Sequence, residues 1–465
     1  MEEIERVELP NPIIDEGNIS SEDDTWEADD VQEYEYNYLA EQWGLEEISR
    51  YNKGGFHPIH LGDALDGRFE VIHKLGSGGF ATVWLCRDRQ LEEWRAVKVM
   101  TADHSPDSAE ARTFEFLKQN SSLEELEQNH IAAPLESFWI EGANGKHLCL
   151  VMEIYGYPVS EWRLDLDNVE SSTKKQSADI CGQITQALAF LHNKGICHGD
   201  FRPSNILMKL NQDALQKLDP TQMTELLGEA EAYEVQTTSG ESPQPRGPEY
   251  CVLAVSQTWC KKLLLEEIMV VDFGESFFAN DLRNTTGIPT PYAAPEVIFH
   301  KEIGIGVDLW SLACTIYEIR TGDKLFGGSF YGSRVNRVVY EMEIILGPLA
   351  KPYREVWERE GLEGPDGIVK VPSLEYKRRQ CITGTRYDDI LEAMLGAERE
   401  QYYSLLSGDR DKPPIKYQYE REEVLALADL LRTLLKYHPG NRLDADKVLQ
   451  HRWLRDAGSL REEAC

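Results

Sequence analysis

Two short polar motifs, standing in a fixed order, constrain this chain more than any other feature of its sequence. The first is HGDFRPSN at 198–205, in which Asp200 and Asn205 stand five residues apart on one short connection. The second is VVDFG at 270–274, which presents Asp272 after an apolar pair. Phosphoryl transfer needs a carboxylate to receive the acceptor hydroxyl's proton, and an amide and a second carboxylate to hold the metal ion. The motifs therefore predict Asp200 as a base and Asn205 and Asp272 as metal ligands.

Elements upstream of these motifs supply groups that can bind phosphate. The sequence LGSGGFATV at 75–83 predicts a turn between strands at 68–74 and 82–87. Its glycines let backbone N–H groups approach phosphate oxygens closely, although Ala81 replaces the third glycine of G-x-G-x-x-G. Lys98 follows in an apolar, strand-like run. A lysine so close to a glycine loop indicates a charge held over phosphates.

Two motifs downstream complete the order that is expected of a protein kinase, namely APE at 294–296 and DLWS at 308–311. From about residue 68 to residue 454 the chain resembles a eukaryotic protein kinase. The resemblance implies an α+β fold of two lobes, with a small, mainly β amino-terminal lobe at 69–153 and a larger, mainly α carboxy-terminal lobe at 154–455. Small-molecule phosphotransferases share the H-G-D-x-x-x-x-N loop, but the APE motif argues against them.

The same resemblance implies a partner for the carboxylate of the APE motif. Arg442, near the end of the last helical stretch, would supply a buried guanidinium for Glu296, which lies 146 residues earlier. An uncompensated carboxylate buried there would be costly, and this is a physical reason to expect the pair.

One branch of the kinases fits best. YNKGGFH at 51–57, followed by GD at 62–63 and GRF at 67–69, resembles the lead-in of the SR-protein kinases, which phosphorylate serines in arginine- and serine-rich splicing factors. An insertion between the catalytic and metal loops is also typical of that family, and we expect a spacer at about 211–265 here. The segment 289–296 lacks the arginines that these kinases carry there, which weakens the case for arginine–serine substrates.

The kinase resemblance also assigns the site, with ATP and Mg²⁺ as the implied cofactors. Met152 would guard the back of the nucleotide pocket, beside the hinge that connects the lobes. The implied catalytic residues are Asp200, Arg202 and Asn205, and the implied Mg²⁺ ligands are Asn205 and Asp272. The implied nucleotide-binding residues are Gly76, Ser77, Gly78, Gly79, Val83, Lys98, Met152 and Glu153.

Besides Ala81, other positions depart from the usual kinase pattern, among them Arg202, which stands where serine/threonine kinases usually carry lysine. Gly199 replaces the arginine that usually precedes the catalytic aspartate, so no cation there waits for an activation-segment phosphate. This favours an enzyme that is not switched by such a phosphate. The helix glutamate that should pair with Lys98 is either Glu110 or Glu115, because the sequence register places Thr113 at that position.

Two other functions stay open. A pseudokinase that binds nucleotide or partners without turnover is suggested by Ala81, Gly199 and the unassigned helix glutamate. It is opposed by the retention of the lysine, the base and both metal ligands. A small-molecule kinase is suggested by the HGD sequence and opposed by the APE motif and the lead-in.

Charge and cysteine content set further bounds. The formal net charge is −33 at pH 7, and acidic residues concentrate in the first fifty positions. Phosphate recognition needs a basic footprint, so we expect no direct nucleic-acid or membrane binding, whereas a basic or arginine–serine-rich protein substrate would be attracted. Nine cysteines without a C-x-x-C pair indicate a reducing compartment. We expect a monomer in the cytoplasm or the nucleus.

Sequence periodicity predicts the remaining organisation. Within the spacer, the segment 229–247 is rich in Ser, Pro, Gly and Glu and lacks apolar periodicity. Around the lobes we expect a flexible acidic extension at 1–50, the lead-in at 51–68 and a tail at 456–465. Strands are predicted at 93–100 and 148–153, and helices at 108–119, 176–194, 307–320, 334–346, 422–435 and 445–449.

Overall fold

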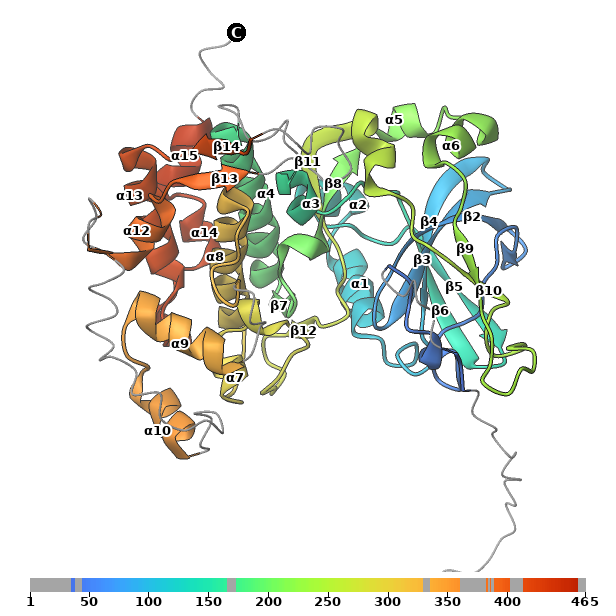
Figure 1. The fold of residues 1–465 in the computed structure, drawn as a ribbon, viewed down its shortest axis with the longest axis horizontal. Coiled ribbons are helices and arrows are strands. Elements are labelled where there is room, and N and C mark those ends of the chain that lie inside the picture. The colour runs from blue at the N-terminus through green and yellow to red at the C-terminus, as the bar shows by residue number, and fades with distance from the viewer. Residues whose placement is uncertain are drawn as a thin grey trace, which may run out of the picture.

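The computed structural model describes residues 35–37, 44–164, 173–328, 335–359, 382–383, 385, 389–401 and 413–458. Within these stretches the chain forms two lobes, a twisted sheet at one end and a group of packed helices at the other (Figure 1). The expected α+β fold of two lobes is confirmed.

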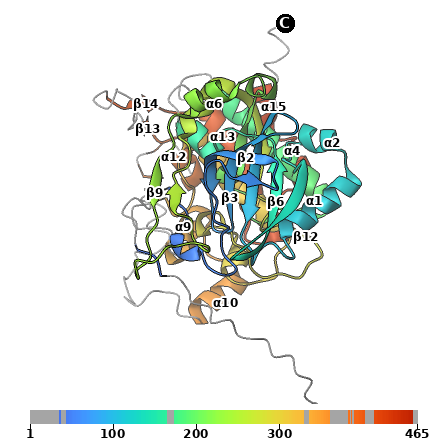
Figure 2. The ribbon, with the colours of Figure 1, turned by 90° about the vertical axis from the view of Figure 1, so that its right-hand side faces the viewer.

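The amino-terminal lobe is built on a six-stranded antiparallel sheet with the strand order β1-β2-β3-β4-β6-β5. The register pairs Lys98 with Val83 on one side and with Leu150 on the other, so the lysine lies in the interior of the sheet. Figure 2 shows these strands in front of the helices of the other lobe. The predicted strands are confirmed, with bounds that differ by a few residues. The strands are β1 Ala64–Leu65, β2 Phe69–Ser77, β3 Ala81–Asp88, β4 Glu93–Met100, β5 Glu136–Gly142 and β6 Gly145–Met152.

Two helices, α1 (Ala109–Asn120) and α2 (Leu123–Gln128), connect β4 to β5. Helix α1 begins at Ser108, whose hydroxyl accepts the N–H of Ala111 and so satisfies one of the free donors of the first turn. Its buried positions are Glu110, Thr113, Phe114 and Leu117, which is the spacing of one helical face. That face is turned toward the sheet and the metal loop.

The carboxy-terminal lobe is helical, as expected. Helix α8 lies in the core of this lobe, because fourteen of the sixteen residues of the helix are buried. No helix in the described part of the chain has both the length and the apolar character needed to cross a membrane. The helices predicted in this lobe are confirmed. Its helices are α3 Val159–Leu164, α4 Thr173–Asn193, α7 Pro295–Ile298, α8 Gly306–Thr321, α9 Val335–Leu346, α10 Lys351–Arg359, α12 Ile390–Leu395, α13 Arg421–Leu434, α14 Ala445–Val448 and α15 Arg452–Gly458.

Short two-stranded ribbons hold the two sequence motifs. The catalytic loop lies between β7 and β8, and the metal loop lies between β11 and β12, with β7 paired to β12 and β8 paired to β11. A third ribbon pairs β13 with β14. The strands are β7 Ile196–Cys197, β8 Ile206–Leu210, β11 Leu264–Val270, β12 Phe277–Phe278, β13 Arg399–Gln401 and β14 Ile415–Tyr417. Short 3₁₀ helices are η1 Ile48–Arg50, η3 Pro203–Asn205, η4 Gln257–Leu263, η5 Thr290–Tyr292 and η6 Pro439–Asn441.

The spacer folds onto the amino-terminal lobe. It contains α5 (Gln212–Leu215), α6 (Pro220–Leu227), β9 (Ala232–Glu234) and β10 (Tyr250–Val252), the last two being paired with each other. Although the segment around β9 lacks apolar periodicity, the spacer is tied to β4, where the Trp94 indole N–H donates to the carbonyl of Leu218 at 2.9 Å. Long-range contacts therefore organise a segment whose local pattern predicts no structure.

The lead-in packs against the same spacer. Ile48, Tyr51 and Phe56 are buried in one cluster with Val235 and Cys251 from the spacer. Just before them, within the segment expected as a flexible extension, the Glu46 carboxylate forms a fully buried ion pair with Lys74 of β2. Packing against the sheet thus already begins at residues 44–50, while most of the acidic extension and the end of the tail lie outside the described residues.

The expected pair between Glu296 and Arg442 is confirmed. Arg442 Nη2 lies 2.8 Å from Glu296 Oε2, and both side chains are almost completely buried. The guanidinium also donates to the carbonyls of Gly306 at 2.7 Å and Lys436 at 3.0 Å. It therefore joins α7, α8 and the segment before α14.

Candidate active site

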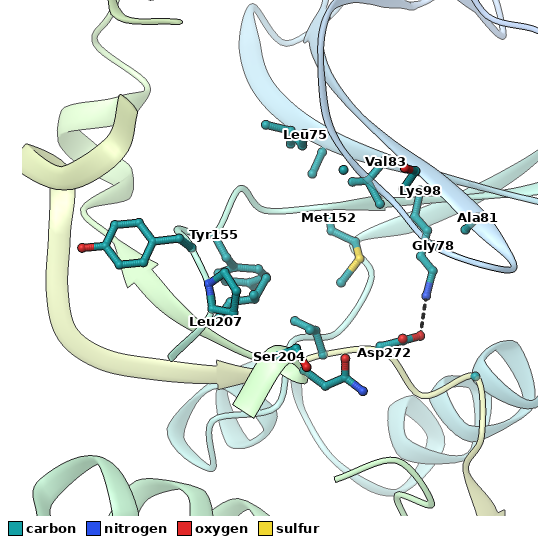
Figure 3. A pocket seen from close by; sticks show the side chains of 18 of the residues that line it. Leu75, Gly78, Ala81, Val83, Lys98, Met152, Tyr155, Ser204, Leu207 and Asp272 are labelled. Atoms are coloured by element: carbon teal, nitrogen blue, oxygen red, sulfur yellow. Dashed lines mark hydrogen bonds and ion pairs between the residues drawn. The ribbon is translucent and has the colours of Figure 1, made fainter. Parts of the chain in front are cut away.

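A cavity of about 470 Å³ lies between the lobes and is lined by the glycine-rich turn, β4, the hinge and both sequence motifs. Figure 3 shows Lys98 pointing from the sheet toward Asp272 across this cavity. Arg202, Asn205 and Asp272 line it, and Asp200 lies directly beside them. All the residues expected to bind nucleotide line it as well, namely Gly76, Ser77, Gly78, Gly79, Val83, Lys98, Met152 and Glu153.

Lys98 joins the two lobes through two carboxylates. Its Nζ lies 2.6 Å from Glu110 Oε2 and 3.0 Å from Asp272 Oδ1. Burial would lower the pKa of Lys98, but the charges of Asp272 and Glu110 outweigh it and raise that pKa above its usual range. The choice that the sequence left open is thus Glu110, because Glu115 lies on the exposed face of α1 and contacts Gln119.

Asp272 is held in a strained backbone conformation. Its φ of +64° lies in the left-handed region, which few non-glycine residues occupy. The next residue, Phe273, anchors the loop, with its ring 4.8 Å from that of Phe114 and 4.9 Å from that of His198. The positive charge of Lys98 lowers the pKa of Asp272 against the opposing effect of burial. The carboxylate is therefore ionised and fixed at the edge of the cavity.

The catalytic loop is shaped from below by Asp308, the first residue of the DLWS motif. Its carboxylate accepts the backbone N–H of His198 at 2.7 Å and that of Gly199 at 3.0 Å, and it lies 3.1 Å from His192 Nε2. Burial would raise the pKa of Asp308, but the hydrogen bond and charge of His192 and the neighbouring donors lower it. The sequence marked this residue only as part of a family motif and gave it no role.

Gly199 is required by the shape of this loop. Its φ is +80°, and a Cβ at this position would lie 2.3 Å from the carbonyl oxygen of Glu275 in the metal loop. An arginine could not be accommodated there unless the two loops moved apart. The departure from the usual kinase pattern is therefore matched by close packing of the catalytic loop against the metal loop.

The Asp200 carboxylate is held from two sides. Arg202 Nε lies 3.0 Å from each carboxylate oxygen, and Asn205 Nδ2 donates to Oδ2 at 2.8 Å. Asn205 also donates to the backbone carbonyl of Asp200 at 2.9 Å, which closes the loop on itself. Burial raises the pKa of Asp200, and the guanidinium of Arg202 opposes that rise. The result is an oriented carboxylate that is more basic than an exposed aspartate.

The residues present fit a nucleotide and a hard divalent cation. Gly76 and Gly78 line the cavity, and a Cβ at either position would meet no atom within 4 Å, so the space beside this backbone is open. Asn205 and Asp272 offer an amide and a carboxylate, which are oxygen ligands of the kind that Mg²⁺ prefers. Their assignment as nucleotide- and metal-binding residues stays a prediction.

Sequence reasoning missed two parts of the cavity wall. Leu75, Tyr155 and Leu207 form apolar walls above, beside and below the hinge end (Figure 3). Val255 and Trp259 come from the spacer and line the same cavity, although they belong to none of the sequence motifs. No local pattern around these two residues indicates a binding role.

Comparisons with known proteins agree with this geometry. The chain matches the family model described as the protein kinase domain over residues 69–238 and 261–454. It is 26% identical to serine/threonine-protein kinase SRPK of Physarum polycephalum over 87% of this chain and 90% of that protein. It is 24% identical to protein kinase dsk1 of Schizosaccharomyces pombe over 88% of this chain and 85% of that protein.

A shorter match and a solved structure complete the comparison. The chain is 34% identical to SRSF protein kinase 3 of Homo sapiens over 37% of this chain and 31% of that protein. A crystallised kinase domain has the same fold, with a TM-score of 0.54 and 21% identity, covering 86% of this chain and 98% of that one. The segment 239–260, which lies outside the family match, belongs to the spacer and includes Val255 and Trp259 of the cavity wall.

Proposed function

The chain belongs to the protein kinase family, and its relatives identify it as a serine/threonine kinase. Membership of this family implies the use of ATP and a divalent metal ion. We propose that the chain is catalytically active, with Asp200 as its base. Lys98 holds the phosphates, and Asn205 and Asp272 hold the metal ion, which we propose is Mg²⁺. When bound, the nucleotide and the metal ion supply the phosphoryl group and neutralise the charge that develops on it.

Asp200 accepts the proton of the substrate hydroxyl as that oxygen attacks. Arg202 and Asn205 hold its carboxylate at 2.8–3.0 Å, so its orientation is set before the substrate arrives. Burial raises the pKa of Asp200, while the Arg202 guanidinium limits the rise, and a base works best when its pKa approaches the working pH. Asp200 is therefore an oriented carboxylate that is more basic than an exposed aspartate.

The observation that carries the proposal is the position of Lys98 between two carboxylates. Kinase catalysis requires the contact between this lysine and the helix glutamate and the correct placement of the metal-binding aspartate at the same time. Lys98 Nζ lies 2.6 Å from Glu110 Oε2 and 3.0 Å from Asp272 Oδ1. A pseudokinase would have no chemical need for this arrangement.

We further propose that activity does not depend on a phosphate in the activation segment. Gly199 provides no cation for such a phosphate. In its place, the Glu275 carboxylate accepts the backbone N–H of Gly287 at 2.8 Å and so ties the metal loop to the activation segment without any modification. Glu275 also packs against Gly199 through its carbonyl, so the same residue contacts both loops.

The proposed substrates are proteins with serines in basic surroundings. The similarity to SRSF protein kinase 3, the lead-in and the net charge of −33 support this class of substrate. The segment that contains η5 offers no arginine to bind a phosphoserine already made, which argues against phosphorylation of many sites in one binding event. The preferred substrate is therefore basic, with few sites modified per encounter.

The proposal is tested by following transfer of the γ-phosphate from ATP to three kinds of acceptor in the presence of Mg²⁺. A basic protein and an arginine–serine peptide should be phosphorylated on serine, and a panel of small metabolites should not. Nucleotide binding without transfer to any acceptor would favour the pseudokinase. Transfer to a metabolite alone would favour the small-molecule kinase.

A further inference from the structure

The tip of the glycine-rich turn touches a residue from outside the sheet. Arg50 ends η1 directly before the lead-in, and its guanidinium carbon lies 5.0 Å from the ring centre of Phe56 and 5.8 Å from that of Phe80. Phe80 follows Gly79 at the tip of the turn. A Cβ built on Gly79 would lie 3.8 Å from Arg50 Nη1. The arginine side chain therefore lies against both the ring and the backbone of the tip.

Residues that follow β4 contact Phe80 from a second side. The His104 ring centre lies 4.3 Å from that of Phe80, and Thr101 N–H donates to the Phe80 carbonyl at 2.9 Å. His104 Nδ1 in turn lies 2.7 Å from Asp103 Oδ1, and Asp103 Oδ2 lies 4.0 Å from Arg50 Nη2. The contacts form a closed ring of neighbours around one aromatic side chain.

These contacts act on a side chain at the tip of a glycine-rich turn. Phe80 is 49% exposed, so burial alone does not fix it. The three preceding positions are Ser77, Gly78 and Gly79, and glycines leave the backbone more conformational freedom than other residues do. Without an external contact, such a turn would sample many positions over the cavity and would lose that freedom whenever nucleotide bound.

We propose that Arg50 is a positioning residue, which holds Phe80 against His104 and thereby fixes the glycine-rich turn over the phosphates. This inference rests on the proposed nucleotide site beneath the turn. A cation over an aromatic ring contributes modestly where water has access and more where water is excluded. The planar guanidinium can contact both Phe56 and Phe80, which the ammonium of a lysine cannot do equally well. Arg50 thus contributes to nucleotide affinity without touching the nucleotide.

The test compares Arg50→Ala with Lys53→Ala, which removes an equal charge from an exposed side chain three residues later. In the nucleotide-free protein, the amides of residues 76–80 should exchange hydrogen several-fold faster in Arg50→Ala and at the parental rate in Lys53→Ala. In steady-state assays, Arg50→Ala should raise KM for ATP about three- to tenfold and leave KM for the protein substrate unchanged. Arg50→Lys should recover only part of the loss.

A double-mutant cycle isolates the contact. If Arg50 acts through Phe80, the variant carrying both Arg50→Ala and Phe80→Ala should have the same KM for ATP as Phe80→Ala alone, within about twofold. Independent, multiplying effects would overturn the proposal, as would unchanged exchange at residues 76–80 in Arg50→Ala. Because the exchange measurement needs no nucleotide, it still decides about Arg50 if the parent protein proves unable to bind ATP, which would instead contradict the proposed function.

Discussion

Replacing Glu296 by Gln removes one charge from the ion pair that joins α7 to the last helices of the carboxy-terminal lobe. Both side chains of this pair are at most 2% exposed, with Arg442 Nη2 2.8 Å from Glu296 Oε2. Arg442 also donates to the carbonyls of Gly306 and Lys436, so it cannot turn toward water. A guanidinium left buried without its carboxylate costs about 3–5 kcal/mol. That is a large part of the roughly 5–15 kcal/mol that stabilises an ordinary domain.

Urea unfolding, followed by tryptophan fluorescence, measures this loss directly. The matched control is Lys447→Ala, which breaks an exposed pair with Asp444 whose side chains are 68% and 61% exposed. Such surface pairs contribute about 0–1 kcal/mol, so the control should hardly move the midpoint. If Glu296→Gln unfolds at the same urea concentration as the control, the buried pair does not stabilise this lobe, and the reasoning from burial and hydrogen bonding is wrong.

Three further predictions concern the active site. Burial raises the pKa of Asp200, and the Arg202 guanidinium opposes this rise. Arg202→Ala should therefore raise the pKa of Asp200 further and move the acid limb of the kcat/KM profile to higher pH, and Arg202→Lys should move that limb less. An unchanged acid limb would exclude Asp200 as the titrating base. Phosphatase treatment should leave basal activity nearly unchanged, and a loss restored by rephosphorylating Thr285, Thr286 or Thr290 would contradict the inference from Gly199. On peptide arrays, serines in basic contexts should be preferred. Their phosphorylation rates should fall as salt rises, because charges are screened beyond about 8–10 Å at physiological ionic strength. A preference for acidic or proline-directed peptides, or phosphorylation of many sites in one binding event, would count against the substrate proposal.

The parts of the site that lie within one loop could be predicted from the sequence. The spacing of Asp200 and Asn205 is set by a single short connection, and their side chains are indeed in contact at 2.8 Å. The long-range pair of Glu296 and Arg442 was predictable from the kinase resemblance, and the need of a buried carboxylate for a partner of opposite charge gives that prediction its physical reason.

The choice between Glu110 and Glu115 needed the face of α1. Register alone placed Thr113 at the critical position, and the structure gives that residue another contact, since its hydroxyl lies 2.7 Å from Ser276 Oγ. A usable signal was present: the apolar residues Phe114 and Leu117 mark the buried face, and Glu110 lies on it whereas Glu115 does not. Helical spacing was therefore a better guide than the register of a family motif.

The long-range contacts of the spacer and of the residues around the lead-in could not be predicted in this way. Val255 and Trp259 reach the cavity because the spacer is anchored to the sheet, for example by the contact of Trp94 with Leu218, and no local periodicity encodes such a contact. The burial of Glu46 was likewise not predictable from local pattern, because its ion-pair partner Lys74 lies on a strand 28 residues later. Sequence pattern describes how one element buries its own face, but not which distant segment covers it.

The central claim, that this chain transfers phosphate with Asp200 as the base, is tested most directly by Asp200→Asn in single-turnover transfer from ATP to a basic protein. The substitution keeps the size of the side chain and removes its ability to take a proton. We expect the transfer rate to fall by about 10²–10⁴-fold while the affinity for ATP, measured by titration, stays close to that of the parent. Equal transfer rates in the variant and the parent would contradict the account.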